Sequence, residues 1–242
     1  MKSLLYCLSI FLFISCQNDF ENQSNSTLSN ETNDEFETAI PDESEIAETS
    51  IPMDLGLRSI EAVDLPNLDY DGNFTDCWTW DDKNGENYLL RTIEEPKFNY
   101  PEEDGWETYD QSLHVYHYSK LETGETILLR DLTDFIKDCE FDLIMNHLEP
   151  VELSDIDNDN YGEIIFGYRL HCTSDVSPSS QKVLLFENGD KYILRGTSVA
   201  MGYGGEYTPG DEFNSGPEGF LDKAENYWEE NKVEYALEPN EY

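Results

Sequence analysis

The stretch DIDNDNYGEIIFGY, residues 155–168, contains the pattern that decides the fold. Its first nine residues carry acids at positions 1, 3, 5 and 9. The run after Glu163 is β-branched and aromatic, which is typical of a strand and not of a helix. An EF-hand is excluded because its glycine at position 6 is Asn160 here, and its glutamate at position 12 is Phe166. The stretch therefore predicts a sharp turn leading into a β-strand, with Asn160 and Gly162 supplying left-handed backbone.

The alternating acids of this turn predict a metal site. Calcium takes about six to eight oxygen ligands at flexible geometry, and a tight loop can direct alternate side chains to one point. Carboxylates this close together would repel one another without a cation. We therefore expect a structural, non-catalytic calcium ion, with ligands from Asp155, Asp157, Asp159, Glu163 and the backbone carbonyl of Tyr161. Magnesium suits the set less well because it keeps its waters. The alternative is a solvated acidic turn.

Three pairs of short apolar runs lie around this loop, and a turn signal separates the members of each pair. The pairs are 77–80 with 88–91, 113–119 with 126–130, and 182–186 with 192–195. Such spacing is typical of antiparallel β-structure. We predict a mainly β fold, an antiparallel β-rich domain that covers residues 61–242. Residues 133–137 also allow a short helix.

A C-terminal helix is predicted after residue 215. Ser215 and Glu218 fit a capping box, with Pro217 in the first turn. Helical periodicity follows in four apolar residues, Phe220, Ala224, Tyr227 and Trp228. We expect this stripe to pack against the sheet and not to bind a partner.

The net charge limits the partners of the protein. The chain has 242 residues, of which 53 are acidic and 14 are basic, for a formal net charge of -39. Nucleic acids are excluded as partners because they bind basic surfaces, and anionic membrane surfaces would repel the chain. Metal ions, basic proteins and polymers with amino groups suit it better. Residues 17–60 are acidic and poor in hydrophobic side chains, which predicts a disordered linker.

The first 16 residues are typical of a bacterial lipoprotein signal peptide. Lys2 precedes an apolar run, 3–15, that is too short to span a bilayer, and Cys16 follows the small residue Ser15. This arrangement resembles the lipobox, in which the cysteine becomes the first mature residue and carries acyl chains such as palmitate. We expect a lipid anchor in the outer membrane, at the cell surface or on the periplasmic face. An ordinary secretory signal that is cut elsewhere is the alternative.

Three cysteines remain after the lipobox: Cys77, Cys139 and Cys172. An extracytoplasmic location permits one disulfide and leaves one thiol, and the sequence allows three pairings. We favour Cys139 with Cys172, since both flank the segment that contains the acidic loop. Three buried thiols are the alternative.

No catalytic motif stands out in the sequence, so no catalytic residue is predicted. His114 and His117 lie three apart in a predicted strand and should face opposite sides, which argues against a zinc site. Trp78 and Trp80 share one strand face. They are expected in the core, and the alternative is that they stack on a sugar.

Several runs together resemble a family of small bacterial lipoproteins that are labelled surface-polysaccharide biosynthesis proteins. The runs are DKNGENYLLRT (82–92), VYHY (115–118), DFIKDCEFDL (134–143), SDIDNDNYGEI (154–164), CTSDVSP (172–178) and KYILRGTS (191–198). The resemblance implies a role in making or displaying cell-surface polysaccharide, with a glycan partner and no known reaction.

The acidic loop itself resembles the calcium hairpins of propeller-type and FG-GAP repeats, which implies a partial-propeller-like domain. That fold is similar to the partial-propeller lysozyme-inhibitor lipoproteins, which share the calcium hairpin. A periplasmic or surface lipoprotein that binds a basic protein, such as a lysozyme, is therefore the alternative function, and the acidic surface suits such a partner.

Overall fold

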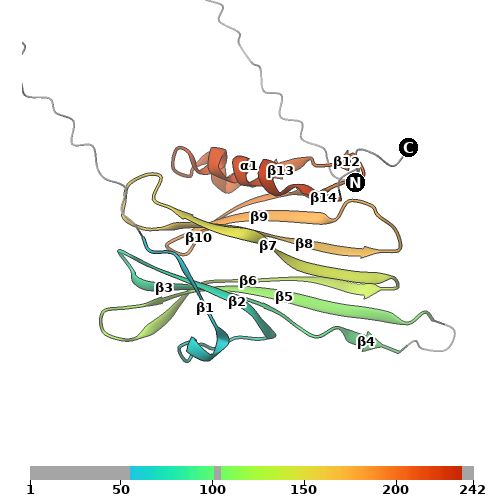
Figure 1. Cartoon of the computed structure of the whole chain (residues 1–242), viewed down its shortest axis with the longest axis horizontal. Helices are drawn as coiled ribbons and strands as arrows, with labels where there is room; N and C mark the ends of the chain where they lie inside the picture. Colours follow the sequence, from blue (N-terminus) through green and yellow to red (C-terminus); the bar gives the residue numbers. More distant parts are fainter. Residues whose placement is uncertain (1–54, 101–104, 236–242) are drawn as a thin grey trace, which may run out of the picture. The chain divides into compact units, whose positions relative to one another are not determined.

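Two antiparallel sheets pack face to face in the computed structural model, which describes residues 55–100 and 105–235 (Figure 1). The first sheet has the order β1-β2-β3-β5-β4, and β6 pairs with the other side of β5. Its strands are β1 (Arg58–Ile60), β2 (Asn73–Asp82), β3 (Gly85–Ile93), β4 (Lys97–Asn99), β5 (Thr108–Lys120) and β6 (Thr126–Cys139). The 3-10 turn η1 (Ala62–Asp64) lies between β1 and β2.

The second sheet has the order β13-β10-β9-β8-β7. Its strands are β7 (Asp142–Ser154), β8 (Glu163–Thr173), β9 (Ser180–Glu187), β10 (Asp190–Thr197) and β13 (Tyr207–Pro209). A small third sheet joins β12 (Tyr203–Gly204), β11 (Val199–Ala200) and β14 (Val233–Tyr235). The 3-10 turn η2 (Asp211–Asn214) precedes the helix α1 (Phe220–Asn231).

Each large sheet contains a four-stranded antiparallel meander, β2-β3-β5-β6 in one and β7-β8-β9-β10 in the other. Propeller blades are four-stranded antiparallel sheets as well, and the partial-propeller resemblance stays a prediction. The predicted mainly β, antiparallel domain with a C-terminal helix is confirmed. The three expected hairpins are also present, as β2–β3, β5–β6 and β9–β10.

The central strands of the second sheet are apolar on both faces because both faces are covered. On the inner face, Phe166 and Phe186 pack against Trp80 and Leu113 of the first sheet. On the outer face, Ile165, Val183 and Leu185 pack against α1. The predicted stripe of α1 is confirmed as a packing face, since Phe220, Ala224, Tyr227 and Trp228 are all buried in this contact.

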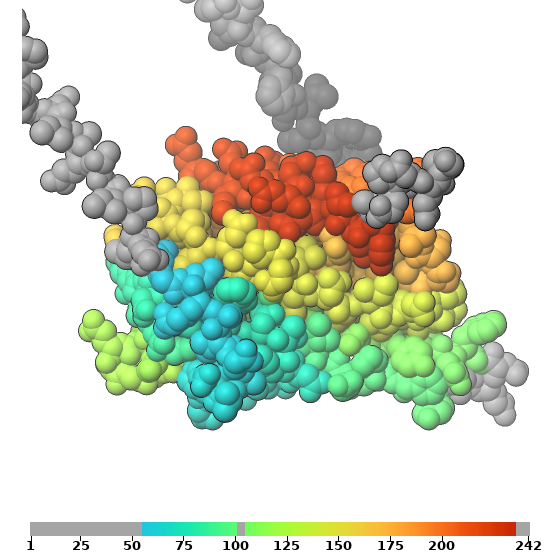
Figure 2. Space-filling view, viewed as in Figure 1, coloured from blue at the N-terminus to red at the C-terminus, as the bar shows by residue number. Residues whose placement is uncertain are grey.

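The outer face of the first sheet is covered by the chain that leads into β2. Cys77, Tyr88 and Tyr116 are buried there beneath Ile60 and Leu65. Figure 2 shows this blue segment and the red helix α1 on opposite sides of the β-layers. Among the described residues, no helix has the length and apolar character that a membrane span requires.

A disulfide joins the ends of β6 and β8, and therefore joins the two sheets. Cys139 and Cys172 form it with their Cα atoms 5.6 Å apart, which confirms the favoured pairing. Cys77 is a free, buried cysteine. Burial raises the pKa of its thiol to about 12, so the thiol stays protonated and inert at neutral pH.

Three boundaries differ from the sequence expectations. The capping box at Ser215 is wrong, because α1 begins after Gly219, whose φ is 92°, and Ser215 ends η2 instead. The short helix at 133–137 is also wrong, since these residues belong to β6 and pair with β5. Residues 55–60, which composition assigned to the linker, are ordered, because β1 pairs with β2. Cys16 and linker residues 17–54 lie outside the described residues.

Candidate metal centre

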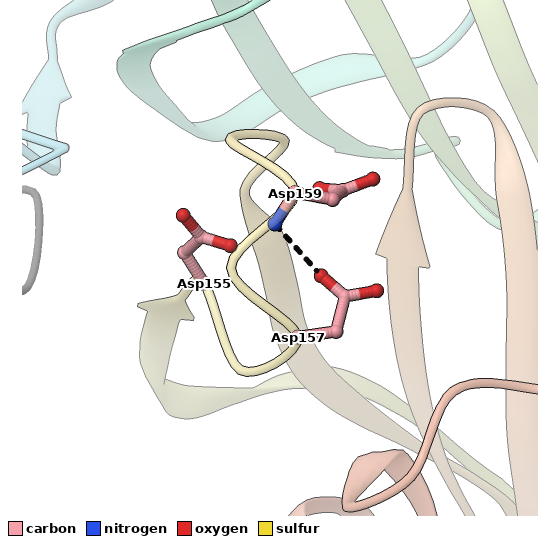
Figure 3. Close-up of side chains that lie close together, drawn as sticks. All are labelled: Asp155, Asp157 and Asp159. Atoms are coloured by element: carbon pink, nitrogen blue, oxygen red, sulfur yellow. Dashed lines mark hydrogen bonds between the residues drawn. The ribbon is translucent and has the colours of Figure 1, made fainter. Parts of the chain in front are cut away.

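The acidic loop, residues 155–162, connects β7 to β8 and brings its carboxylates together. Asp155, Asp157 and Asp159 each offer an oxygen, and these atoms lie within 4.8 Å of one another. Figure 3 shows the three side chains on this one loop, where the Asp159 amide donates to Asp157 Oδ1 at 3.2 Å. The alternation of acids in the sequence thus becomes a cluster of oxygens in space.

A second group of carboxylates extends the cluster. Glu163, the first residue of β8, and Glu187, the last residue of β9, lie with Asp157 so that their oxygens are within 4.8 Å of one another. Sequence reasoning predicted Glu163 and missed Glu187. Ile164 pairs with Phe186 across the two strands, which brings the strand ends together. Only this strand register connects Glu187 to the loop, because 24 positions separate Glu187 from Glu163 in the chain.

The backbone of the loop turns at two asparagines. Asn158 has a φ of 59° and Asn160 a φ of 70°, so both adopt the left-handed conformation that asparagine tolerates. The expectation for Asn160 is confirmed. For Gly162 it is wrong, since Gly162 does not have a positive φ. Glycine is needed there for space, because a Cβ atom would lie 2.8 Å from Trp80 Nε1 and 2.9 Å from Leu153 Cδ1.

The β2–β3 turn of the first sheet holds the loop in place. Asp82 Oδ2 accepts from the Gly162 amide at 3.0 Å and from Trp80 Nε1 at 3.1 Å. The Lys83 amide donates to the Asn160 carbonyl at 2.9 Å. The Lys83 ammonium lies 4.4 Å from the centre of the Tyr161 ring. The loop is therefore a contact between the two sheets as well as a cluster of acids.

Two of the acids have no partner for a buried oxygen. Glu187 is 8% exposed. Its Oε1 atom, together with Asp155 Oδ1, lacks a hydrogen-bond partner among residues 55–100 and 105–235. Glu163 is fully buried, and both of its oxygens accept from the Ile156 amide at 2.9 Å. Buried carboxylate oxygens without donors are costly, so a cation would satisfy them.

The electrostatics of the cluster also favour a cation. Burial raises the pKa of Glu187 to about 8, and the charges of Asp157 and Asp159 contribute to this rise. Burial likewise raises the pKa of Asp157, with a contribution from Asp159. Burial raises the pKa of Glu163 against the effect of the Ile156 amide. Within the described part of the chain, no Lys, Arg or His forms an ion pair with these acids.

The chemistry of the donor set fits calcium. All of the side-chain donors are carboxylates from Asp155, Asp157, Asp159, Glu163 and Glu187. Such a set suits a hard cation that tolerates irregular geometry, which favours calcium over magnesium and zinc. The Tyr161 amide donates to Asp159 Oδ1 at 2.8 Å. The carbonyl ligand expected from Tyr161 stays a prediction.

The other residues that the sequence singled out belong to the core. His114 and His117 face opposite sides of β5, as expected: His114 stacks near Tyr116 on the outer face, and His117 lies against Trp80 on the inner face. Trp80 is fully buried, and Trp78 packs against the same inner core. Trp80 is therefore not available to stack on a sugar, whereas Trp78 is partly buried.

Comparison with protein-family models, with curated proteins and with solved structures finds no match for this chain. The resemblance to surface-polysaccharide lipoproteins therefore stays a prediction, which rests on the six sequence runs quoted above.

Proposed function

We propose that this chain is a lipid-anchored outer-membrane protein whose β-domain is a non-catalytic binding or scaffold module, stabilised by calcium, in the biosynthesis or display of surface polysaccharide. The observation that carries the metal part is Glu187, a buried acid beside Asp157 and Glu163, one of whose oxygens has no hydrogen-bond partner among the described residues. The anchor at Cys16 and the polysaccharide role are supported by the sequence resemblances alone.

Calcium has a structural role in this proposal because of where the loop lies. The loop contacts the β2–β3 turn of the first sheet, and it carries its acids between β7 and β8 of the second sheet. An ion at this point removes the repulsion between the acids and fixes both strand ends. A domain exposed outside the cell would gain rigidity from this contact in addition to that from the disulfide.

Calorimetric titration of the metal-free domain tests the metal proposal. We expect calcium to bind and to raise the melting temperature, and we expect Asp157→Asn to weaken both effects. Asp222→Asn is the matched control, because Asp222 is an exposed acid on α1 that takes no part in the cluster. If calcium gives no heat of binding and does not raise the melting temperature of the wild-type domain, the proposal is wrong.

Metabolic labelling with palmitate tests the anchor. Wild-type protein should incorporate label and partition into detergent, and Cys16→Ala should do neither. A variant that is still labelled and still partitions into detergent would contradict the lipobox.

A deletion strain separates the two functional classes. A polysaccharide module predicts an altered surface polysaccharide and an unchanged sensitivity to lysozyme. The alternative, an inhibitor that binds a basic protein, is favoured by the net charge of -39. It predicts tight binding to a lysozyme that weakens steeply with salt. An unchanged polysaccharide profile in the deletion strain would refute the first class.

A further inference from the structure

Four of the 14 basic residues of this acidic chain meet at one edge of the two sheets. Arg130, Lys191 and Arg195 line one pocket of about 480 Å³. Lys182, Lys191 and Arg195 line an adjoining pocket of about 320 Å³. Arg195 also lines a third hollow, beside β13. Pockets of this size accommodate small ligands.

The strand pattern places these residues on the inward-facing side of the second sheet, at an open edge of the sandwich and not in its core. Ile193 of β10 is buried between the sheets. Side chains alternate along a strand, so Lys191 and Arg195 flank Ile193 on the same inner face. Lys182 pairs with Arg195 across β9 and β10 and shares that face. Lys182 and Lys191 are half-buried there and Arg195 is exposed, so the three cations line an edge of the sandwich that a ligand can reach.

In the described part of the chain, three of these four cations form no ion pair. Lys182 forms an ion pair with Asp134 of β6. Arg130 donates through Nε to the Gly189 carbonyl at 2.6 Å. Within residues 55–100 and 105–235, Arg130, Lys191 and Arg195 form no ion pair with an acidic side chain. Unpaired cations at the mouth of a pocket are the groups that bind a carboxylate or a phosphate.

The same pockets also offer acceptors and hydroxyls. Asp190, Glu212 and Ser215 line the first pocket. Asp131 and Thr133 line the second. Carboxylates and hydroxyls next to cations form a mixed polar lining, which suits a ligand with both an acidic group and several hydroxyls. A simple inorganic anion would leave these acceptors unused.

We propose that the pockets around Lys191 and Arg195 bind an acidic sugar, a hexose unit that carries a carboxylate or a phosphate. Arg195 and Lys191 bind the acidic group, and the neighbouring carboxylates accept from the sugar hydroxyls. The choice of a sugar over other small organic anions rests on the proposed polysaccharide function. The net charge of -39 repels long polyanions, so the ligand is a short segment or a single unit.

Calorimetry with defined probes, in calcium buffer, tests this site on the whole mature protein. The probes are trigalacturonate, galactose 1-phosphate, neutral galactotriose and inorganic phosphate. We expect binding of a carboxylated or a phosphorylated sugar, and the first two probes distinguish these two sources. The neutral sugar and phosphate should bind at least about tenfold more weakly. The neutral sugar lacks the acidic group that the cations bind, and phosphate lacks the sugar hydroxyls that the carboxylates bind.

Substitutions locate the binding. Arg195→Gln should lower the affinity for the acidic sugar by about tenfold or more, and Lys191→Gln should lower it by a smaller factor. Lys97→Gln is the matched control, since the Lys97 side chain is 74% exposed on β4 and lies outside these pockets. Melting curves confirm folding, and backbone NMR shifts at residues 191 and 195 report contact directly. No binding of either acidic sugar, equal binding of inorganic phosphate, or full binding by Arg195→Gln would each overturn the proposal.

The pocket and the proposed function fail separately. If no acidic sugar binds but the deletion strain loses polysaccharide, the pocket assignment is wrong and the functional class stands. If an acidic sugar binds through Arg195 but the deletion strain has normal polysaccharide, the site stands and the functional class is wrong.

Discussion

Replacing Glu187 by glutamine should have opposite effects with and without calcium. In the metal-free fold the pKa of Glu187 is raised from 4.5 to about 8. The folded state therefore holds this proton more tightly than the unfolded chain does. The stability that this one proton contributes to the fold is fully present below pH 4.5 and is lost as the pH rises through 8. One unit of pKa is worth about 1.4 kcal/mol, so half of the shift already costs the metal-free fold about 2 kcal/mol.

Glu187→Gln removes this charge, so we expect the variant to melt about 4–8 °C above the wild type in EDTA at pH 8. In saturating calcium the order should reverse, because the variant has lost one carboxylate ligand. Scanning calorimetry at both conditions measures the two differences, and Glu122→Gln, in the exposed β5–β6 turn, serves as control. If Glu187→Gln is no more stable than the wild type in EDTA, or keeps the full gain from calcium, Glu187 does not belong to a metal site.

Three further predictions concern the frame of the site. Gly162→Ala should lower the free energy of unfolding by about 1–3 kcal/mol, because its Cβ would overlap Trp80 and Leu153; a urea titration equal to the wild type would refute the close contact. The Cys139–Cys172 disulfide spans 33 positions, so its reduction should lower the free energy of unfolding by about 3–4 kcal/mol. Reductant should therefore lower the melting temperature, and Cys139→Ser should lower it by the same amount. Burial lowers the pKa of His117 from 6.5 to about 3, so the unfolded chain takes up the proton first and stability falls as the pH drops from 6.5 towards 3. His117→Phe should make the free energy of unfolding depend less on pH in this range. A smaller dependence should remain in this variant because burial also lowers the pKa of His147 to about 3.

The local signals in the sequence predicted local structure well. The strand character after Glu163, the turn signals between the paired apolar runs and the helical stripe from Phe220 each depend on neighbours within a few residues. The disulfide pairing could be favoured because Cys139 and Cys172 flank the acidic loop, which the antiparallel strands β7 and β8 bring back on itself. The strand, the turns and the helical stripe need no knowledge of how the two sheets meet, whereas the disulfide joins β6 of one sheet to β8 of the other.

Features that depend on the meeting of distant strands were not predictable. Glu187 joins the acidic cluster through the register of β8 and β9, and one acid among 53 carries no local mark. Gly162 was misread for the same reason, since the atom nearest to a side chain placed there is Trp80 Nε1 of the other sheet. The helix start was misjudged because Gly219 reaches a left-handed φ of 92°, whereas the sequence offered a better capping residue four positions earlier.

The two proposed sites share one hairpin, and this should couple them. Glu187 ends β9, and the Asn188-Gly189 turn leads directly to Lys191 on β10. An ion that holds Glu187 also restrains this turn, so less entropy is lost when a sugar binds at Lys191. We expect the acidic sugar to bind about fivefold more tightly in calcium than in EDTA, and calcium to bind more tightly by the same factor when the sugar is present. Titrations in both orders measure the two factors, and equal affinities with and without calcium would show that the hairpin transmits nothing between the sites.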